Sequence, residues 1–246
     1  NSRRSPVYGT HGMVASSQPL ASMAGIEILK QGGNAADAAV AVSAALNMTE
    51  PCSTGIGGDA FCLYFDAKTK NVSGLNASGR APAALNLEYL AAQGITGKLP
   101  PASPHTVTVP GAAAGWVDTL GKYGTMTMPE VLAPAIKLGE EGFPVSPLTA
   151  RSWNFGIPKL KNGPHFNEML INGRAPGAGE IMKNVNLAKT FRSVAEHGKA
   201  GFYEGRIAEE IIKVLDPMGG VMTVDDLKAH YNTYPEPITT NYKGLD

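Results

Sequence analysis

Cysteine is scarce in this sequence, and long apolar runs are missing. The two cysteines, Cys52 and Cys62, cannot build a disulfide framework, and their spacing is not the CxxC of a zinc or redox site. We expect both to be buried, small apolar residues, because neither has an activating neighbour in sequence. No apolar run approaches the roughly 18 residues that span a bilayer, and the opening NSRRSPVYGTHG has no apolar core behind its basic residues. We therefore expect no membrane span, and any signal peptide to have been removed.

An excess of either charge is also lacking. Lys and Arg together number 21, as do Asp and Glu, so there is no basic field to attract nucleic acid. With 246 residues, 43% of them hydrophobic, the chain can bury a large core. We interpret residues 1–246 as a single domain and the Pro/Gly-rich stretch 94–111 as an ordered crossing rather than a linker.

Several catalytic and metal-binding motifs do not occur. The five histidines form no HExxH or i,i+4 pair, which argues against a metal site. There is no GxSxG nucleophile elbow. Ser53 and Thr54 could supply a hydroxyl nucleophile, but hydroxyls before a glycine turn usually cap backbone amides.

Periodicity predicts a mixture of helices and strands. Strand-like residues occupy 12–17, 61–66, 72–77 and 236–244, and helical spacing occupies 19–31, 34–48, 113–123, 129–142, 185–198, 205–216 and 223–230. Asn34 is a natural N-cap with Asp37 three residues on, and the Ala-rich helix that follows should be packed on most of its surface. The order of elements predicts a layered α/β or α+β domain.

The loop PCSTGIGGDAF, residues 51–61, brings three glycines together between a helix and a strand. Gly55, Gly57 and Ala60 match the dinucleotide-binding pattern, but there the strand should come first, so nucleotide binding is disfavoured. We expect Gly55, Gly57 and Gly58 to allow a turn with positive φ between the helix and a buried strand. They are then the scaffold of a site rather than its chemistry.

Arg80 is the one candidate for substrate binding. It follows a predicted strand, with Gly79 before it and Pro82 after it. A guanidinium there could hold a carboxylate through two parallel hydrogen bonds. The residues alone leave open an exposed loop arginine or a structural ion pair.

One long segment and several later strings together resemble a known family. GGNAADAAVAVSAALNMTEPCSTGIGGDAF is similar to the N-terminal part of the γ-glutamyltransferases, or glutathione hydrolases. The likeness continues in order through VPGAAAGWVDTLGKYGTM, NLAKTFRSVAEHG, GGVMTVDDLKAHY and PITTNYKG, from about Gly12 to Gly244. A series of matches in fixed order is a specific signal.

The resemblance implies an α+β fold, the four-layer αββα sandwich of N-terminal-nucleophile hydrolases. It also implies a precursor that cleaves itself into a large and a small subunit, which could form a higher oligomer. The nucleophile is the N-terminal Thr of the small subunit, with its own α-amino group as base. It transfers a γ-glutamyl group from a donor such as glutathione to water or an amino acid, and no metal or organic cofactor is needed.

For this chain the resemblance implies an incomplete large subunit. The nucleophile is expected in the small subunit of the same precursor and not at Thr239 or Thr240. Arg80 is the residue that matches the family's arginine for the α-carboxylate of the donor. The family pattern separates that arginine from Ala-Pro by two residues, whereas Ala81 and Pro82 directly follow Arg80.

Other functions stay open beside this one. With the departure at Arg80, and with Asp59 where the family has glycine, the chain also resembles glutathione-hydrolase-like proteins and acylases that cleave other amides. An uncleaved relative that only binds its ligand is a further alternative. The resemblance favours a periplasmic or secreted protein, and a cytoplasmic one is possible.

Overall fold

The computed structural model describes residues 5–161 and 163–245. The described α-helices are α1 (Pro19–Lys30), α2 (Ala35–Thr49), α3 (Leu87–Ala92), α4 (Ala112–Tyr123), α5 (Met128–Glu141), α6 (Pro147–Leu160), α7 (Val185–His197), α8 (Ala200–Tyr203), α9 (Gly205–Leu215) and α10 (Val224–Lys228). The described strands are β1 (Ala60–Asp66), β2 (Asn71–Ala77), β3 (Phe143–Pro144) and β4 (Ile181–Met182). The fold is α+β, as expected from the sequence, and the described chain contains few strands.

Helix α2 is the centre of the helical layer. It starts with a capping box in which Asn34 and Asp37 satisfy each other's backbone amides, as the sequence predicts. Most of its small side chains are buried against α1, α4 and α5, and alanines let these helices approach closely. Ala39 is exposed, however, so the helix is not covered on all sides by the described chain.

The antiparallel hairpin β1–β2 lies where the sequence predicts two strands, and its register runs from Ala60 opposite Ala77 to Asp66 opposite Asn71. One face lies on α4, where a Cβ added to Gly115 would be 2.8 Å from the Cβ of Ala77. The other face is bare: Phe61, Leu63 and Phe65 are 70%, 74% and 56% exposed. Strand β1 is therefore not the buried strand that the sequence predicts.

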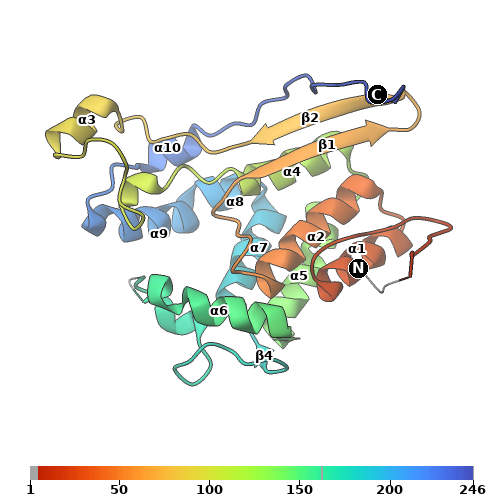
Figure 1. Ribbon diagram of the computed structural model, residues 1–246, viewed down its shortest axis with the longest axis horizontal. Coiled ribbons are helices and arrows are strands. Elements are labelled where there is room, and N and C mark those ends of the chain that lie inside the picture. Colours follow the sequence, from red (N-terminus) through yellow and green to blue (C-terminus); the bar gives the residue numbers. More distant parts are fainter. Residues whose placement is uncertain (1–4, 162, 246) are drawn as a thin grey trace.

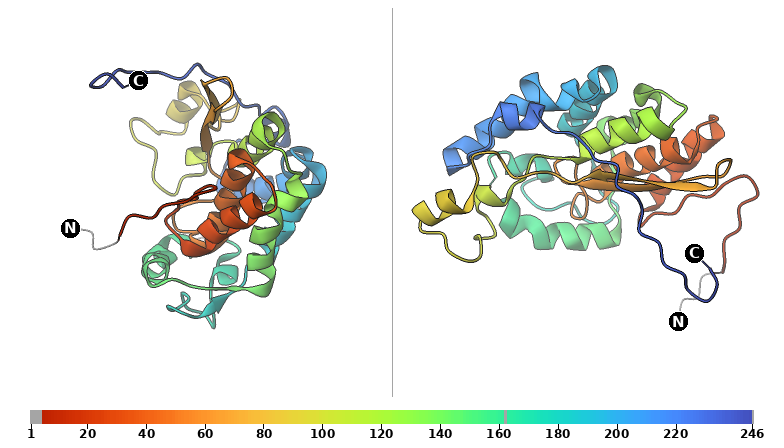
Figure 2. Two further views of the ribbon diagram at one scale, coloured as in Figure 1. Left: turned by 90° about the vertical axis from the view of Figure 1, so that its right-hand side faces the viewer. Right: turned by 90° about the horizontal axis from the view of Figure 1, so that it is seen from above.

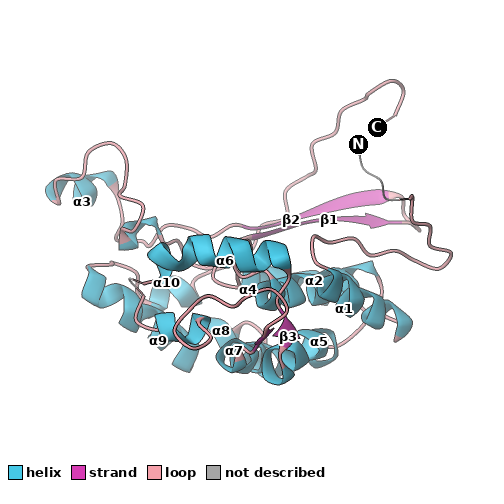
Figure 3. Cartoon of the chain, turned by 60° about the horizontal axis from the view of Figure 1, so that its bottom comes forward, coloured by secondary structure: helices cyan, strands magenta, loops and turns pink. Residues whose placement is uncertain are grey.

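The hairpin crosses the helices on one side of the molecule (Figure 1). Helices α5 and α7 pack on each other behind α2, and α6 lies with the short β3–β4 ladder at the opposite end from the hairpin (Figures 1 and 3). The first described residues and the segment after residue 236 both extend to the same side of the molecule (Figure 2). No described helix is both long and apolar enough to cross a bilayer.

Two strand predictions are wrong. Residues 12–17 and 236–244 form no ladder, and the second segment has only an isolated bridge from Tyr242 to Leu245. Both have strand-like side chains but no neighbouring strand in the described chain, and a strand needs a partner for its backbone groups.

Helices α3, α6 and α8 were not predicted. In α6 the prolines at 147 and 158 lie at the first residue and near the end, where a helix tolerates them better, and Ser146 caps its start. Because proline normally argues against a helix, the two prolines explain why α6 was not predicted from the sequence.

Candidate functional site

The loop after α2 is held in place by backbone hydrogen bonds and not by glycines in the left-handed conformation. Gly55, Gly57 and Gly58 all lack a positive φ, so the predicted positive-φ turn is wrong. A Cβ on Gly55 or Gly57 would meet nothing within 4 Å. The Gly58 carbonyl instead accepts hydrogen bonds from the amides of Gly111 at 3.0 Å and Ala112 at 2.9 Å. It thereby satisfies amides at the start of α4 that have no partner within the helix.

The same loop is joined to the segment that carries Arg80. The Oδ1 of Asp59 accepts a hydrogen bond from the Gly79 amide at 2.7 Å. A Cβ on Gly79 would collide with the Val109 carbonyl oxygen, and one on Gly111 would collide with the Ala77 carbonyl oxygen. The glycines that this region requires for close approach are thus Gly79 and Gly111. The need for glycine at position 111 was not predicted, because it arises from a carbonyl 34 residues earlier in the chain.

Arg80 is exposed, and neighbouring residues contact both its backbone and its guanidinium. Its carbonyl accepts a hydrogen bond from the Val109 amide at 2.9 Å. Its guanidinium lies 3.9 Å from the centre of the Tyr231 ring, and Nη1 donates to the Tyr231 carbonyl at 2.8 Å. Within the described part of the chain no carboxylate forms an ion pair with Arg80. The structural ion pair left open by the sequence is therefore not formed here.

A polar cluster surrounds the two residues that flank Tyr231 in sequence, the residue on which Arg80 lies. Asp118 pairs with Lys199 at 2.7 Å and accepts a hydrogen bond from Asn232 at 2.7 Å. The His230 ring stacks on Tyr203, with centroids 5.4 Å apart. Burial lowers the pKa of His230, and the cations of Arg80 and Lys199 lower it further. His230 is therefore neutral near pH 7, and the cluster anchors residues 230–232.

No described group of three or more His, Cys, Asp or Glu side chains is arranged to hold a metal ion.

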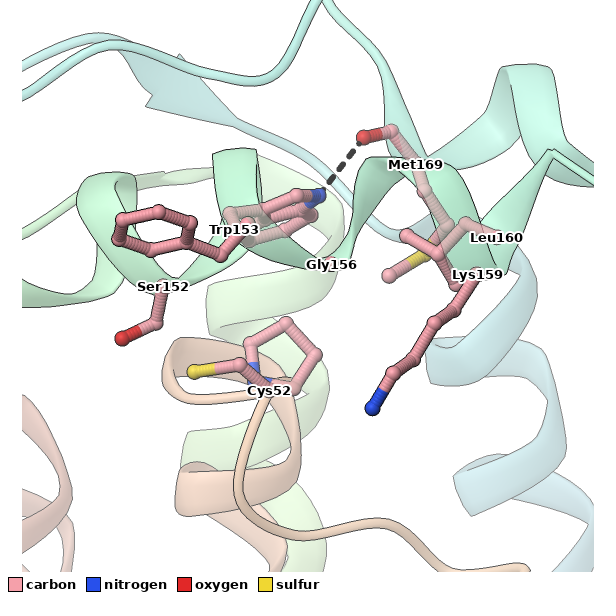
Figure 4. Close-up of a pocket in the computed structure, with 9 residues that line it drawn as sticks. Cys52, Ser152, Trp153, Gly156, Lys159, Leu160 and Met169 are labelled. Atoms are coloured by element: carbon pink, nitrogen blue, oxygen red, sulfur yellow. Dashed lines mark hydrogen bonds between the residues drawn. The ribbon is translucent and has the colours of Figure 1, made fainter. Parts of the chain in front are cut away.

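A separate open cavity of about 370 Å³ lies between the loop at residues 51–52 and helix α6 (Figure 4). Trp153 lines it and donates its indole N–H to the Met169 carbonyl at 3.0 Å. Lys159 adds a cation to this mainly apolar lining. Cys52 lies at this cavity and is exposed, and Cys62 is half-buried, so neither is the buried residue that the sequence predicts.

Residues 21–246 match the family model described as Gamma-glutamyltranspeptidase. The chain is 38% identical over 241 residues to the glutathione hydrolase proenzyme of Bacillus subtilis. That alignment covers 96% of this chain and 41% of the relative. The chain thus spans less than half the length of this relative.

Solved structures of a γ-glutamyltranspeptidase and of an acylase superimpose closely on this chain. The cephalosporin acylase of Bacillus halodurans superimposes with a TM-score of 0.93 at 43% identity, covering 99% of this chain and 46% of the acylase chain. The γ-glutamyltranspeptidase of Helicobacter pylori superimposes with a TM-score of 0.91 at 32% identity, covering 97% of this chain and 70% of that chain.

Proposed function

Because the chain belongs to the γ-glutamyltranspeptidase family, we propose that it is the incomplete large-subunit part of a self-processing enzyme that cleaves a γ-glutamyl amide. The remainder of the precursor then supplies the rest of the large subunit and a small subunit with an N-terminal threonine. The similarity to a proenzyme of more than twice this length supports such a division. In this proposal residues 1–246 form one domain, which contributes part of a four-layer αββα sandwich.

The bare face of the β1–β2 hairpin supports a partner. A row of large apolar side chains, among them Phe61 and Leu63, is left without cover by the described residues. Exposed apolar patches of this kind mark interaction surfaces in soluble proteins. We assign this face to a second layer of strands from the small subunit, packed on it through side chains.

The observation that carries the proposed substrate class is the state of Arg80. Its guanidinium is exposed, is held against Tyr231 and has no carboxylate partner among the described residues. A γ-glutamyl donor such as glutathione presents an α-carboxylate, which an arginine can bind through two hydrogen bonds. We assign that carboxylate to Arg80, and the loop at Gly55, Gly57 and Gly58 to the scaffold that supports the Arg80 segment.

The proposed reaction needs a nucleophile from the small subunit. Its threonine hydroxyl oxygen attacks the amide carbonyl carbon, while the threonine's own α-amino group takes the hydroxyl proton. That proton passes to the departing amine as the C–N bond breaks, leaving the γ-glutamyl group as an ester on the threonine. Water or an amino acid then attacks the ester and restores the hydroxyl. This chain's part is to bind and orient the donor.

A second candidate is an acylase of the same fold that cleaves a different amide. The similarity to a cephalosporin acylase at 43% identity favours it, as does the shortened segment after Arg80. An uncleaved relative that binds a ligand without catalysis is the remaining alternative.

Intact mass spectrometry and N-terminal sequencing of the full-length gene product separate these possibilities. Two chains, the smaller beginning with threonine, are expected; a single uncleaved chain would favour the binding protein. The mature enzyme is then given γ-glutamyl-p-nitroanilide and glutaryl-p-nitroanilide, which differ by the α-amino group, and 4-aminobutyryl-p-nitroanilide, which lacks the α-carboxylate. Preference for the γ-glutamyl compound is expected, whereas preference for either of the others would favour an acylase.

A further inference from the structure

We propose that Tyr231 is a positioning residue for Arg80: its ring and its carbonyl hold the guanidinium so that the remaining N–H groups are presented together to a carboxylate. This inference rests on the proposed function, because it assigns Tyr231 to the same carboxylate site.

The backbone around Arg80 is fixed, but those contacts do not orient its side chain. The Gly79 amide is held by Asp59, and the Arg80 carbonyl by the amide of Val109. The Ala83 amide donates to Asp226 at 2.9 Å. An arginine side chain on such a loop still has many rotamers, and each of them places the guanidinium differently. The contacts to Tyr231 select one.

The two contacts from Tyr231 act on different parts of the guanidinium. The ring lies 3.9 Å from Cζ and covers one face of the planar group, an arrangement that attracts a cation. The Tyr231 carbonyl takes one N–H of Nη1 at 2.8 Å. Together they fix the plane of the guanidinium and its rotation within that plane. Donors on its other edges stay available for the parallel pair of hydrogen bonds that a carboxylate accepts.

Tyr231 can act in this way because both of its neighbours are anchored. Asn232 is 8% exposed and donates to Asp118, which is paired with Lys199. His230 stacks on the buried ring of Tyr203. The residue after Asn232 pairs with the edge of β2, since Thr233 and Asn76 exchange hydrogen bonds of 3.0 and 2.8 Å. The backbone that carries the Tyr231 ring is therefore held on both sides, although the residue itself is 60% exposed.

The test uses the full-length gene product and compares three variants with the wild type. Tyr231→Leu removes the ring, Tyr231→Phe keeps it, and Tyr242→Leu is the control, because Tyr242 is an exposed tyrosine that accompanies Lys243 and not Arg80. Steady-state kinetics are measured with γ-glutamyl-p-nitroanilide and with its analogue that lacks the α-carboxylate. If Tyr231→Leu does not mature, Tyr231→Met, which keeps volume without an aromatic face, replaces it.

We expect Tyr231→Leu to raise KM for the carboxylate-bearing donor by about tenfold, with kcat within about twofold of wild type and no change for the analogue. Tyr231→Phe and Tyr242→Leu should behave as the wild type. A mature Tyr231→Leu enzyme with an unchanged KM ratio between the two donors would overturn the inference.

Arg80→Gln separates failure of this inference from failure of the proposed function. If Arg80→Gln abolishes the preference for the carboxylate and Tyr231→Leu does not, only the role of Tyr231 is overturned. If Arg80→Gln leaves the preference intact, the carboxylate site and the inference both fall.

Labelling with phenylglyoxal adds a readout that needs no substrate. Peptide mass spectrometry should show Arg80 modified several-fold faster in Tyr231→Leu than in the wild type or Tyr242→Leu. Equal rates would overturn the positioning role.

Discussion

The Asp37 carboxylate accepts two kinds of hydrogen bond from Thr125, 88 residues later in the chain. The Thr125 hydroxyl donates to Oδ2 at 2.7 Å, and its amide donates to Oδ1 at 3.0 Å. Met126 adds its amide at 3.2 Å, and the amide of Asn34 completes the set at 2.7 Å. A single fully buried carboxylate thus joins the start of α2 to the loop between α4 and α5.

Replacing this carboxylate should be costly. Asp37→Asn keeps the shape but turns amide hydrogens toward backbone donors, and we expect it to lower the free energy of unfolding by about 3 kcal/mol. Urea unfolding of the full-length product measures the loss. Glu130→Gln is the matched control, because Glu130 occupies the equivalent position of an exposed capping box with Thr127. A loss no larger than that of the control would show that the buried bonds of Asp37 contribute little.

The contribution of Asp37 should depend on pH in one direction. Burial raises the pKa of its carboxyl, but the hydrogen bonds from Asn34, Thr125 and Met126 outweigh burial and hold it below the ordinary 3.8. The carboxylate therefore stabilises the fold fully above its unfolded pKa, and this stabilisation decreases as the pH falls below about 4 through the folded pKa. The stability difference between wild type and Asp37→Asn should shrink over that range. A difference that grows on acidification would contradict the assignment.

Glycine should be needed at positions 79 and 111 and replaceable at 57. Gly79→Ala and Gly111→Ala drive a Cβ into a carbonyl oxygen, and such overpacking costs about 1–3 kcal/mol or more. Gly57→Ala has open space and no positive φ. Differential scanning fluorimetry should show a lower Tm for the first two variants only. Equal Tm values for all three would mean that the backbone around Arg80 shifts without cost.

The bare hairpin face should be needed for assembly. Leu63→Lys puts a cation at the centre of that face, and we expect the full-length product to fail in forming a mature two-chain enzyme, because an unpaired charge would be buried. Leu87→Lys is the control, since Leu87 is 84% exposed on α3. Gel electrophoresis of the purified products reports the cleavage. Normal maturation of Leu63→Lys would place the partner elsewhere.

Arg80→Lys should affect substrate binding and not maturation. A lysine keeps the charge but cannot make two parallel hydrogen bonds to one carboxylate, so we expect KM for a γ-glutamyl donor to rise by about tenfold or more. Kinetics of the mature variant measure the effect. Unchanged kinetics would remove Arg80 from the site.

Local sequence rules predicted the local parts of the fold. Asn34 caps the start of α2 as predicted, and β1 and β2 each begin within one residue of a segment that the sequence predicts as a strand. The failures are non-local. Residues 12–17 look like a strand but have no described strand beside them, and Ala39, in an apolar helix, faces away from the packed side.

Only part of the candidate site could be predicted, because the rest of it depends on contacts between residues far apart in sequence. Arg80 could be chosen from its residue type and neighbours, but no local pattern connects it with Tyr231. The need for glycine at position 111 comes from the carbonyl of Ala77, which sequence spacing cannot place. The glycines at 55 and 57, which sequence analysis selected, have room for a side chain.

The contact between Arg80 and Tyr231 spans 151 residues of chain. During synthesis, Arg80 leaves the ribosome long before Tyr231 exists, and at about 5–20 residues per second the delay is on the order of ten seconds. Through that interval the arginine has no ring to lie on, while the hairpin that precedes it can already form from neighbouring residues. The guanidinium can thus take up this arrangement only after translation has passed residue 231. An Arg80 side chain held on the Tyr231 ring therefore marks a chain that has been synthesised at least that far.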